Sequence, residues 1–241
     1  MKKLLRRLFS FFGIRISRTS GYNRFEAIED VLSHLRAIGF RPGIVIDGGA
    51  NVGSWTTMAR RYFPEAEFHL VEMQQACLPA LNALAASEKR THVHLIALVE
   101  PGVERVGIVG EGTGTGIDLN AGAETDGGIP GKTLDELFAR RQSKGPIFLK
   151  LDLEGYELRA LRGAIELLPR CGFVLLETGF YDIANAGTCT FAELTQRLHE
   201  SGFDVYDFAS LSSRPRDGRL RQGDVLYAKR GLTLTDDVQW D

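Results

Sequence analysis

The sequence predicts an α/β fold in which a doubly wound, mostly parallel sheet carries helices on both faces. Short apolar runs of strand length alternate with amphipathic stretches of helix length, an order that is typical of parallel sheets. The run 147–152 is almost continuously apolar, which indicates a central strand covered on both faces. Several strand-like runs also end in an acidic residue, at the sheet edge where such folds bind their ligands.

The elements follow from periodicity and from the residues that interrupt it. An apolar face at helical spacing predicts a first helix over 24–38, and Pro42 with Gly43 then breaks the chain. Pro64 and Pro169 end two later helices. Helices are further expected at 54–62, 75–86, 156–168 and 190–201, and strands at 44–47, 67–72, 92–98, 103–109, 147–152, 173–177, 203–208 and 224–229.

A glycine-rich stretch, 110–131, interrupts this alternation. It holds eight glycines and no apolar period, so it is either a loop that covers a substrate or a disordered excursion. Its side chains available for sugar hydroxyls are Thr113, Thr115 and Asp118. Regular structure resumes at Thr133, which with Glu136 has the spacing of a capping box.

Length and composition indicate one α/β domain, here assigned to residues 21–241. The hydrophobic content of 44% is ordinary for a globular protein, and the net charge of −2 provides no general attraction to nucleic acid. The three cysteines are odd in number and widely spaced, which indicates reduced thiols and a cytoplasmic location.

Residues 1–20 form a separate basic, amphipathic segment. Six Lys or Arg residues fall within 1–18, before the first acid at Glu26. The apolar run 8–14 is far shorter than the roughly 20 residues that span a bilayer. Two interpretations stay open: a helix in peripheral contact with the inner face of an anionic membrane, or a segment that is a helix packed on the domain or a frayed tail.

The most informative motif is the turn after the first predicted strand, 44–53, with sequence Ile-Val-Ile-Asp-Gly-Gly-Ala-Asn-Val-Gly. Its glycines allow a sharp turn and a close approach to a ligand. Glu72 ends the next strand, 25 residues after Asp47, and its carboxylate can accept hydrogen bonds from two ribose hydroxyls. The motif therefore predicts a nucleoside site.

The same turn argues against a dinucleotide. It lacks the G-x-G-x-x-G spacing that brings a helix N-terminus against a pyrophosphate, and the carboxylate of Asp47 would repel phosphate oxygens. A nucleoside with a positive centre fits better, and S-adenosylmethionine has both features. An NAD(P)-linked sugar oxidoreductase or epimerase is the alternative enzyme class.

Two motifs resemble those of the FkbM-type S-adenosylmethionine-dependent methyltransferases. The turn 45–53 is similar to the family's glycine motif. The run 149–157, Leu-Lys-Leu-Asp-Leu-Glu-Gly-Tyr-Glu, followed by Leu-Arg-Gly-Ala at 161–164, resembles its more specific second signature. The resemblance implies a Rossmann-like, class I methyltransferase fold and O-methylation of a hydroxyl on a sugar, a glycan or another natural product.

The resemblance also implies roles for individual residues. Glu72 would hold the ribose hydroxyls, and Met73 could pack on the adenine ring. The residues expected around the methionine part are Asp47, Gly49, Asn51 and Gly53, and those flanking the adenine are Ala97 and Leu98.

The second signature also has a chemical interpretation. An alcohol does not ionise at neutral pH, so its methylation requires a base or a metal near the oxygen. Asp152 and Glu154 follow a strand and could both face the crevice, where they are the predicted catalytic pair and candidate Mg²⁺ ligands. Lys150 could hold Asp152 ionised, and it is, with Glu177, a candidate substrate-contacting residue. Alternatively, Asp152 caps the helix that follows.

The histidines and the basic N-terminus allow two further interpretations. His69, His92 and His94 lie in predicted strands without a metal-type spacing, so a structural role is expected for them. The basic N-terminus allows a third class of function, a non-catalytic cofactor-binding partner of a membrane-bound glycan assembly system. The acceptor, the oligomeric state and the need for a metal are not encoded in any motif.

Overall fold

The computed structural model describes residues 23–109, 116–118, 128–182 and 188–235. The basic segment 1–20, and Thr113 and Thr115 of the glycine-rich stretch, lie outside these ranges. Among the described helices, none combines the length and apolar character needed to cross a bilayer.

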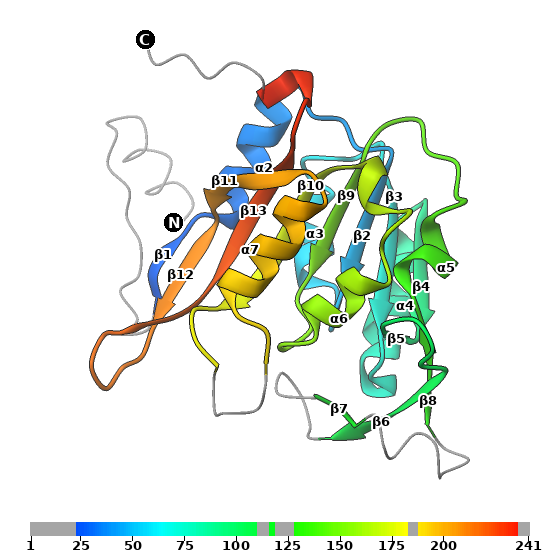
Figure 1. The fold of residues 1–241 in the computed structure, drawn as a ribbon. Coiled ribbons are helices and arrows are strands. Elements are labelled where there is room, and N and C mark those ends of the chain that lie inside the picture. Colours follow the sequence, from blue (N-terminus) through cyan, green and yellow to red (C-terminus); the bar gives the residue numbers. More distant parts are fainter. Residues whose placement is uncertain (1–22, 110–115, 119–127, 183–187, 236–241) are drawn as a thin grey trace, which may run out of the picture.

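A nine-stranded sheet forms the centre of the fold (Figure 1). Its order is β1 (Asn23–Glu26), β12 (Ser210–Ser213), β13 (Leu220–Lys229), β10 (Cys171–Gly179), β9 (Ile147–Leu151), β2 (Ile44–Gly48), β3 (Glu67–Glu72) and β4 (Thr91–Leu95), and β11 (Phe203–Phe208) also pairs with β13. The five strands from β10 to β4 are parallel, and β13 runs antiparallel to β10. The order reverses direction between β2 and β9, which creates the switch point where open α/β sheets bind ligands. The predicted Rossmann-like fold is confirmed.

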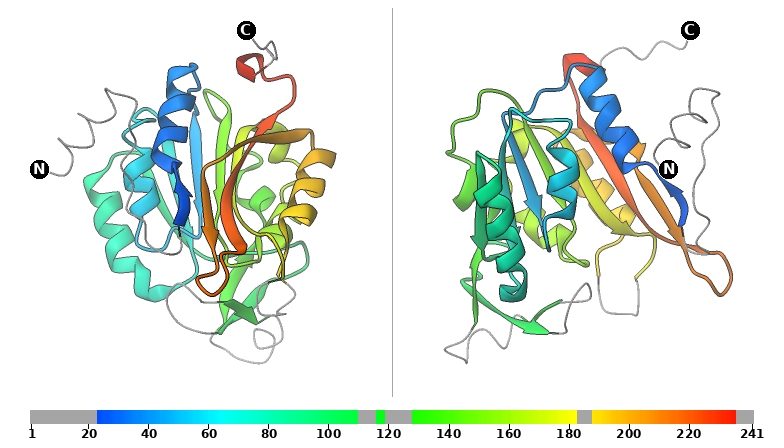
Figure 2. Two further views of the ribbon diagram at one scale, coloured as in Figure 1. Left: turned by 90° about the vertical axis from the view of Figure 1, so that its left-hand side faces the viewer. Right: turned by 180° about the vertical axis from the view of Figure 1, so that it is seen from behind.

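Helices cover both faces of this sheet (Figure 2). The helices on one face are α2 (Ile28–Ala37), α3 (Ser54–Ala59) and α4 (Leu78–Ser87), and those on the other are α5 (Leu134–Phe138), α6 (Glu157–Arg162) and α7 (Phe191–Glu200). Each face has its own apolar core, because strand residues alternate between the two sides. Leu149 belongs to one core, for example, and its neighbour Phe148 to the other.

A second, four-stranded sheet lies below the first in Figure 1. Its order is β5 (Ala97–Leu98), β8 (Ile129–Lys132), β6 (Arg105–Val109) and β7 (Gly116–Asp118). The expected strand 92–98 is therefore two strands, because β4 pairs with β3 only as far as Leu95 and β5 pairs with β8. This break directs Ala97 and Leu98 to the end of the main sheet, where the candidate site lies.

Several other boundaries differ from those expected, and three of them are informative. Residues 23–26 are strand β1 rather than helix, because they pair with β12, about 185 positions later in the chain. Helix α6 ends at Arg162 rather than at 168, because the backbone leaves the helical conformation at Gly163, which has φ −93° and ψ 21°. Strand β13 begins at Leu220 instead of 224, because its first half also pairs with β12 and β10. Short 3-10 turns complete the fold at Gln75–Cys77, Leu168–Arg170 and Thr233–Thr235.

The predicted capping box is confirmed. The Thr133 hydroxyl accepts from the Glu136 backbone N–H at 3.1 Å, and the Glu136 carboxylate accepts from the Thr133 N–H at 2.7 Å. Thr190 and Glu193 form the same motif at the start of α7.

Candidate active site

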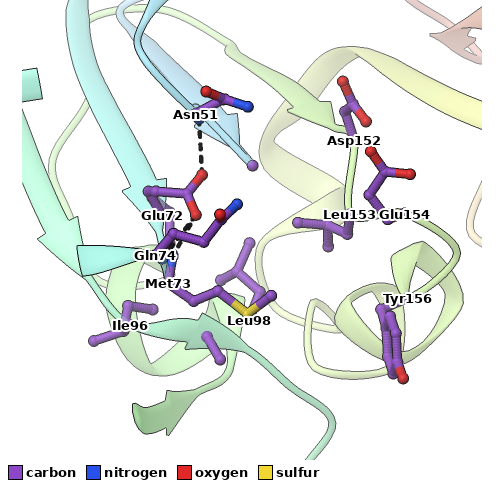
Figure 3. Close-up of a pocket in the computed structure, with 13 residues that line it drawn as sticks. Asn51, Glu72, Met73, Gln74, Ile96, Leu98, Asp152, Leu153, Glu154 and Tyr156 are labelled. Carbon is purple, nitrogen blue, oxygen red and sulfur yellow. Dashed lines mark hydrogen bonds between the residues drawn. The ribbon is translucent and has the colours of Figure 1, made fainter. Parts of the chain in front are cut away.

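A pocket opens at the carboxyl ends of β2, β3 and β9 (Figure 3). Figure 3 shows Glu72 on one side of it and the carboxylates of Asp152 and Glu154 on the other. Its lining is Gly49, Asn51, Val71, Glu72, Met73, Gln74, Ile96, Ala97, Leu98, Asp152, Leu153, Glu154 and Tyr156. The predicted glycine motif, ribose acid and second signature therefore meet around one cavity.

The glycines of the turn make room for the chain itself. Gly49 has φ +72°, and a Cβ there would lie 1.9 Å from the Asp152 carbonyl oxygen. Gly53 has φ +79° and precedes α3, and a Cβ there would lie 2.7 Å from Leu84 Cδ2. Gly49 therefore allows the turn after β2 to touch the segment after β9. Gly53 does not line the pocket, and it packs closely against Leu84 of α4.

The carboxylate of Glu72 connects the two turns beside the pocket. Its Oε1 accepts from the backbone N–H groups of Met73 and Gln74 at 2.9 and 2.8 Å. Its Oε2 accepts from the Asn51 N–H at 2.8 Å, and Asn51 adopts φ +48°. Because Oε1 already accepts two hydrogen bonds and Oε2 one, Oε2 is the oxygen with capacity for a ligand hydroxyl.

An apolar wall adjoins this carboxylate. Met73, Ile96 and Leu98 line the pocket next to Glu72 (Figure 3), and Met73 packs against the small cluster of Ala97, Val99 and Val106. A polar acceptor beside an apolar surface suits a ligand that combines a diol with a flat aromatic ring.

Asp47 and Lys150 form a buried ion pair next to the pocket rather than lining it. Lys150 Nζ lies 3.0 Å from Asp47 Oδ1 and 3.6 Å from Asp152 Oδ2, and it donates to the Gly49 carbonyl at 3.1 Å. The Thr56 hydroxyl donates to Asp47 Oδ2 at 2.6 Å. Asp47, predicted at the methionine part, and Lys150, predicted at the substrate, contact each other, and neither lines the pocket.

Neighbouring carboxylates keep the Lys150 side chain in its charged form. Burial acts to lower the pKa of the ammonium, but the carboxylates of Asp47 and Asp152 outweigh burial and raise the pKa above its ordinary value. The cation remains beside Asp152, as the sequence suggested.

Replacing Lys150 with Met should destabilise the fold by about 3–5 kcal/mol, because Asp47 would be left buried without its cation. Urea unfolding followed by circular dichroism measures this change. The double variant Lys150→Met with Asp47→Asn is the matched control, since it removes both charges and should recover much of the stability. A single variant as stable as the wild type would contradict the assignment.

Three carboxylates gather at the other side of the pocket. Asp152, Glu154 and Glu177 each place an oxygen within 4.8 Å of the other two. Glu177 belongs to β10 and accepts from Gln222 Nε2 at 2.8 Å. Glu154 has φ +53°, a conformation that non-glycine residues adopt mainly at turns and functional sites.

This crowding changes the acidity of the cluster. Burial and then the neighbouring Asp152 raise the pKa of Glu154 to about 7. Burial, followed by Asp152 and Asp224, raises the pKa of Glu177 to about 9. Near neutral pH the group therefore keeps a proton on Glu177, while Glu154 exchanges its own. Such a group can take a proton from a hydroxyl, and its oxygens are also of the type that binds a divalent cation.

Residues 47–205 match the family model of the methyltransferase FkbM domain. The chain belongs to the FkbM methyltransferase family. The match begins at Asp47 and includes the second signature at 149–164, so the resemblance noted in the sequence is confirmed.

The chain is similar to solved structures of methyltransferases, and the first of them shows the fold. The FkbM methyltransferase from Methylobacillus flagellatus KT has a TM-score of 0.53 and 16% identity, covering 85% of this chain and 48% of that one. This chain thus spans about half the length of that protein. The 1,6-didemethyltoxoflavin-N1-methyltransferase of Burkholderia thailandensis, solved with 1,6-didemethyltoxoflavin and S-adenosylhomocysteine, has a TM-score of 0.45 and 16% identity, covering 85% and 79% of the two chains. No curated protein matches the chain.

Several lining residues of this FkbM domain were not predicted. Gln74 and Tyr156 could have been predicted from the sequence, because Gln74 lies two residues after Glu72 and Tyr156 lies inside the second signature. Val71, Ile96 and Leu153 could not, since an apolar residue near a strand end is most often core. The third acid of the cluster, Glu177, was predicted only as a substrate-contacting residue, and it is not among the lining residues of the pocket.

The Glu177→Gln variant should be more stable than the wild type at alkaline pH. The folded protein holds the Glu177 proton up to about pH 9, whereas the unfolded chain loses it near the ordinary glutamic acid pKa of 4.5. The stability contributed by this proton therefore decreases as pH rises through that interval. Glutamine keeps the contact to Gln222 without the charge, so we expect a gain of roughly 0.5–2 kcal/mol at pH 8–9 and little at pH 5.

Thermal unfolding between pH 5 and pH 9 tests this expectation. The exposed Glu104 provides the control, because Glu104→Gln should change the profile little. A Glu177→Gln profile that runs parallel to the wild type would contradict the assigned acidity.

Proposed function

We propose that this FkbM domain transfers a methyl group from S-adenosylmethionine to a hydroxyl of a sugar, a glycan or another natural product. The observation that carries the proposal is the position of Glu72 on one side of a pocket and of Asp152 and Glu154 on the other. Family and fold support methyl transfer, and the lining residues fit the cofactor. Glu72 Oε2 offers an acceptor for a ribose hydroxyl, and Met73, Ile96 and Leu98 offer an apolar surface for adenine.

When bound, the cofactor supplies a methyl group on a positively charged sulfur. The chain positions the two reactants and provides a carboxylate base. Gly49 and Asn51 bring the turn after β2 against the cavity, and Lys150 keeps a positive charge beside Asp152. Asp152 and Glu154 would receive the acceptor hydroxyl and take its proton, so that the oxygen attacks in line with the methyl group.

A divalent cation is a second way to activate the hydroxyl. Asp152 and Glu154, joined by Glu177, would then bind Mg²⁺ through carboxylate oxygens. Activity measured after treatment with EDTA, and again after Mg²⁺ is returned, distinguishes activation by a carboxylate base from activation by a metal ion. The base mechanism expects unchanged activity, and the metal mechanism expects a loss that Mg²⁺ reverses.

The acceptor can be identified by labelling. Purified protein is incubated with methyl-labelled cofactor and an extract of its own cells, and the labelled product is isolated. A labelled ether on a sugar or related compound supports the proposal, whereas label on nitrogen would redirect it to another acceptor class. Cofactor binding without any labelled product would favour the non-catalytic partner. The NAD(P)-linked alternative is not favoured by the family or the fold.

We further propose that residues 21–241 act as one cytoplasmic domain, with 1–18 in peripheral contact with the inner face of the membrane. The support is the basic and apolar pattern of the segment. Flotation with vesicles that contain anionic lipid should recover the full chain but not a chain lacking 1–18. Equal flotation of both would exclude this role and favour a helix packed on the domain.

A further inference from the structure

A histidine-rich cluster lies on strands β3 and β4 at the edge of the main sheet, beside α5 (Figure 1). Glu67 and His69 share one face of β3, and His92 and His94 share the same face of β4 because His69 pairs with His92 in register. Glu67 begins β3, whereas Glu72, at its end, lines the cofactor pocket. The cluster is therefore at the opposite end of the strand from the proposed chemistry.

The donor atoms of this cluster lie close together, with the rings of His69 and His92 stacked 4.9 Å apart. Glu67 Oε1 lies 2.9 Å from His69 Nε2 and 3.2 Å from His92 Nε2, and all three atoms lie within 4.8 Å of one another. In a tetrahedral zinc site with bonds of 2.0–2.1 Å, ligand atoms are about 3.3 Å apart. Two imidazoles and one carboxylate are also a common zinc ligand set, which leaves a fourth position for water.

The surroundings orient the buried histidine as a ligand. His69 Nδ1 lies 2.9 Å from His94 Nε2, so that His94 can accept the Nδ1 proton and leave the Nε2 lone pair directed at Glu67 and His92. Phe138 packs edge-on against both His69 and His94, with ring centroids 5.1 and 5.7 Å away. The half-exposed His92, whose side chain is 49% accessible, gives an ion a route to the site.

We propose that Glu67, His69 and His92 bind a borderline divalent cation of the Zn²⁺ class. The ion would fasten the edge strand β4 to β3 and would take no part in methyl transfer. The guanidinium group of Arg141 competes with the metal ion for Glu67, since Arg141 Nη1 lies 3.7 Å from Glu67 Oε1. The Arg141 side chain is 42% accessible and can move into solvent when the ion binds.

Calorimetric titration with ZnCl₂ tests the site on untagged, EDTA-treated, full-length protein. We expect one Zn²⁺ per chain at this site, with a higher melting temperature in its presence. His92→Ala should weaken binding by more than the roughly 10–100-fold that loss of an outer-shell partner costs, and His94→Ala by about that amount. Arg141→Gln should strengthen binding several-fold, because it removes the competing charge.

Two controls separate this site from others. His199→Ala removes an exposed histidine that pairs with Asp204, and Glu154→Gln disturbs the acid cluster, so neither should change this Zn²⁺ affinity. Because His92 is exposed, its variant should fold, and circular dichroism checks this. Equal affinity in the wild type and in His92→Ala, or no binding by the wild type, would overturn the proposal and leave a network of hydrogen bonds only.

Discussion

Replacing Glu72 with Gln should weaken S-adenosylmethionine binding by about 10–100-fold. A hydrogen bond to a charged group contributes roughly 1.5–3 kcal/mol, and each 1.4 kcal/mol is a factor of ten in affinity. Loss of the carboxylate removes the proposed bond to a ribose hydroxyl at Oε2. It also sets an amide NH₂ against either the Asn51 N–H or the Met73 and Gln74 N–H groups, which loosens the loops that line the pocket. Isothermal titration calorimetry measures the change.

Glutamine is the appropriate substitution at this position. Alanine would leave three backbone N–H groups without the carboxylate, so that weak binding could come from a collapsed turn alone. Glu67→Gln on the same strand is the matched control and should bind the cofactor as the wild type does, because Glu67 lies at the far end of β3. Affinity that survives in a folded Glu72→Gln variant would remove the ribose assignment.

Replacing Glu154 with Gln should lower turnover by about 10²–10⁴-fold while leaving cofactor affinity within a few-fold. A general base is most effective when its pKa is close to the working pH, and burial beside Asp152 brings Glu154 to about 7. Wild-type activity should therefore rise with pH through about 7, as Glu154 loses its proton. Rates measured from pH 5 to pH 9, with the acceptor found by labelling, test this profile.

The Asp152→Asn variant separates the two carboxylates. The neighbouring Asp152 raises the pKa of Glu154, so replacing it with Asn should lower that pKa and move the rising limb of the activity profile to lower pH. If Glu154 is the base, Asp152→Asn keeps measurable turnover with this shifted profile. If Asp152 is the base, its variant loses turnover and Glu154→Gln keeps it. Full activity in both variants would place the base elsewhere.

The predictable parts of this molecule depend on local sequence. Strand β3 and its terminal Glu72, the capping box at Thr133 and the two signature motifs all follow from spacing within a few residues. The fold class followed as well, because apolar alternation reflects burial on two faces of a sheet. The expected cofactor residues Asn51, Met73, Ala97 and Leu98 all line the pocket.

The unpredicted parts depend on contacts between distant segments. Gly49 is needed because the Asp152 carbonyl, about a hundred positions later, lies where its Cβ would be. The ion pair of Asp47 with Lys150 was not predicted, because it is the pairing of β2 with β9 that brings the two residues together. The histidine cluster follows from the register of β3 with β4, which no spacing along the chain reveals. Sequence motifs therefore located the site, while sheet register decided which side chains face it.

The central claim is that the pocket between Glu72 and the acid cluster binds S-adenosylmethionine. Calorimetric titration of the wild-type chain with S-adenosylmethionine, S-adenosylhomocysteine and NAD⁺ tests it most directly. We expect both sulfur nucleosides to bind with one site per chain, in competition with each other, and NAD⁺ to give no saturable heat. Saturable binding of NAD⁺ without binding of either sulfur nucleoside would contradict the account.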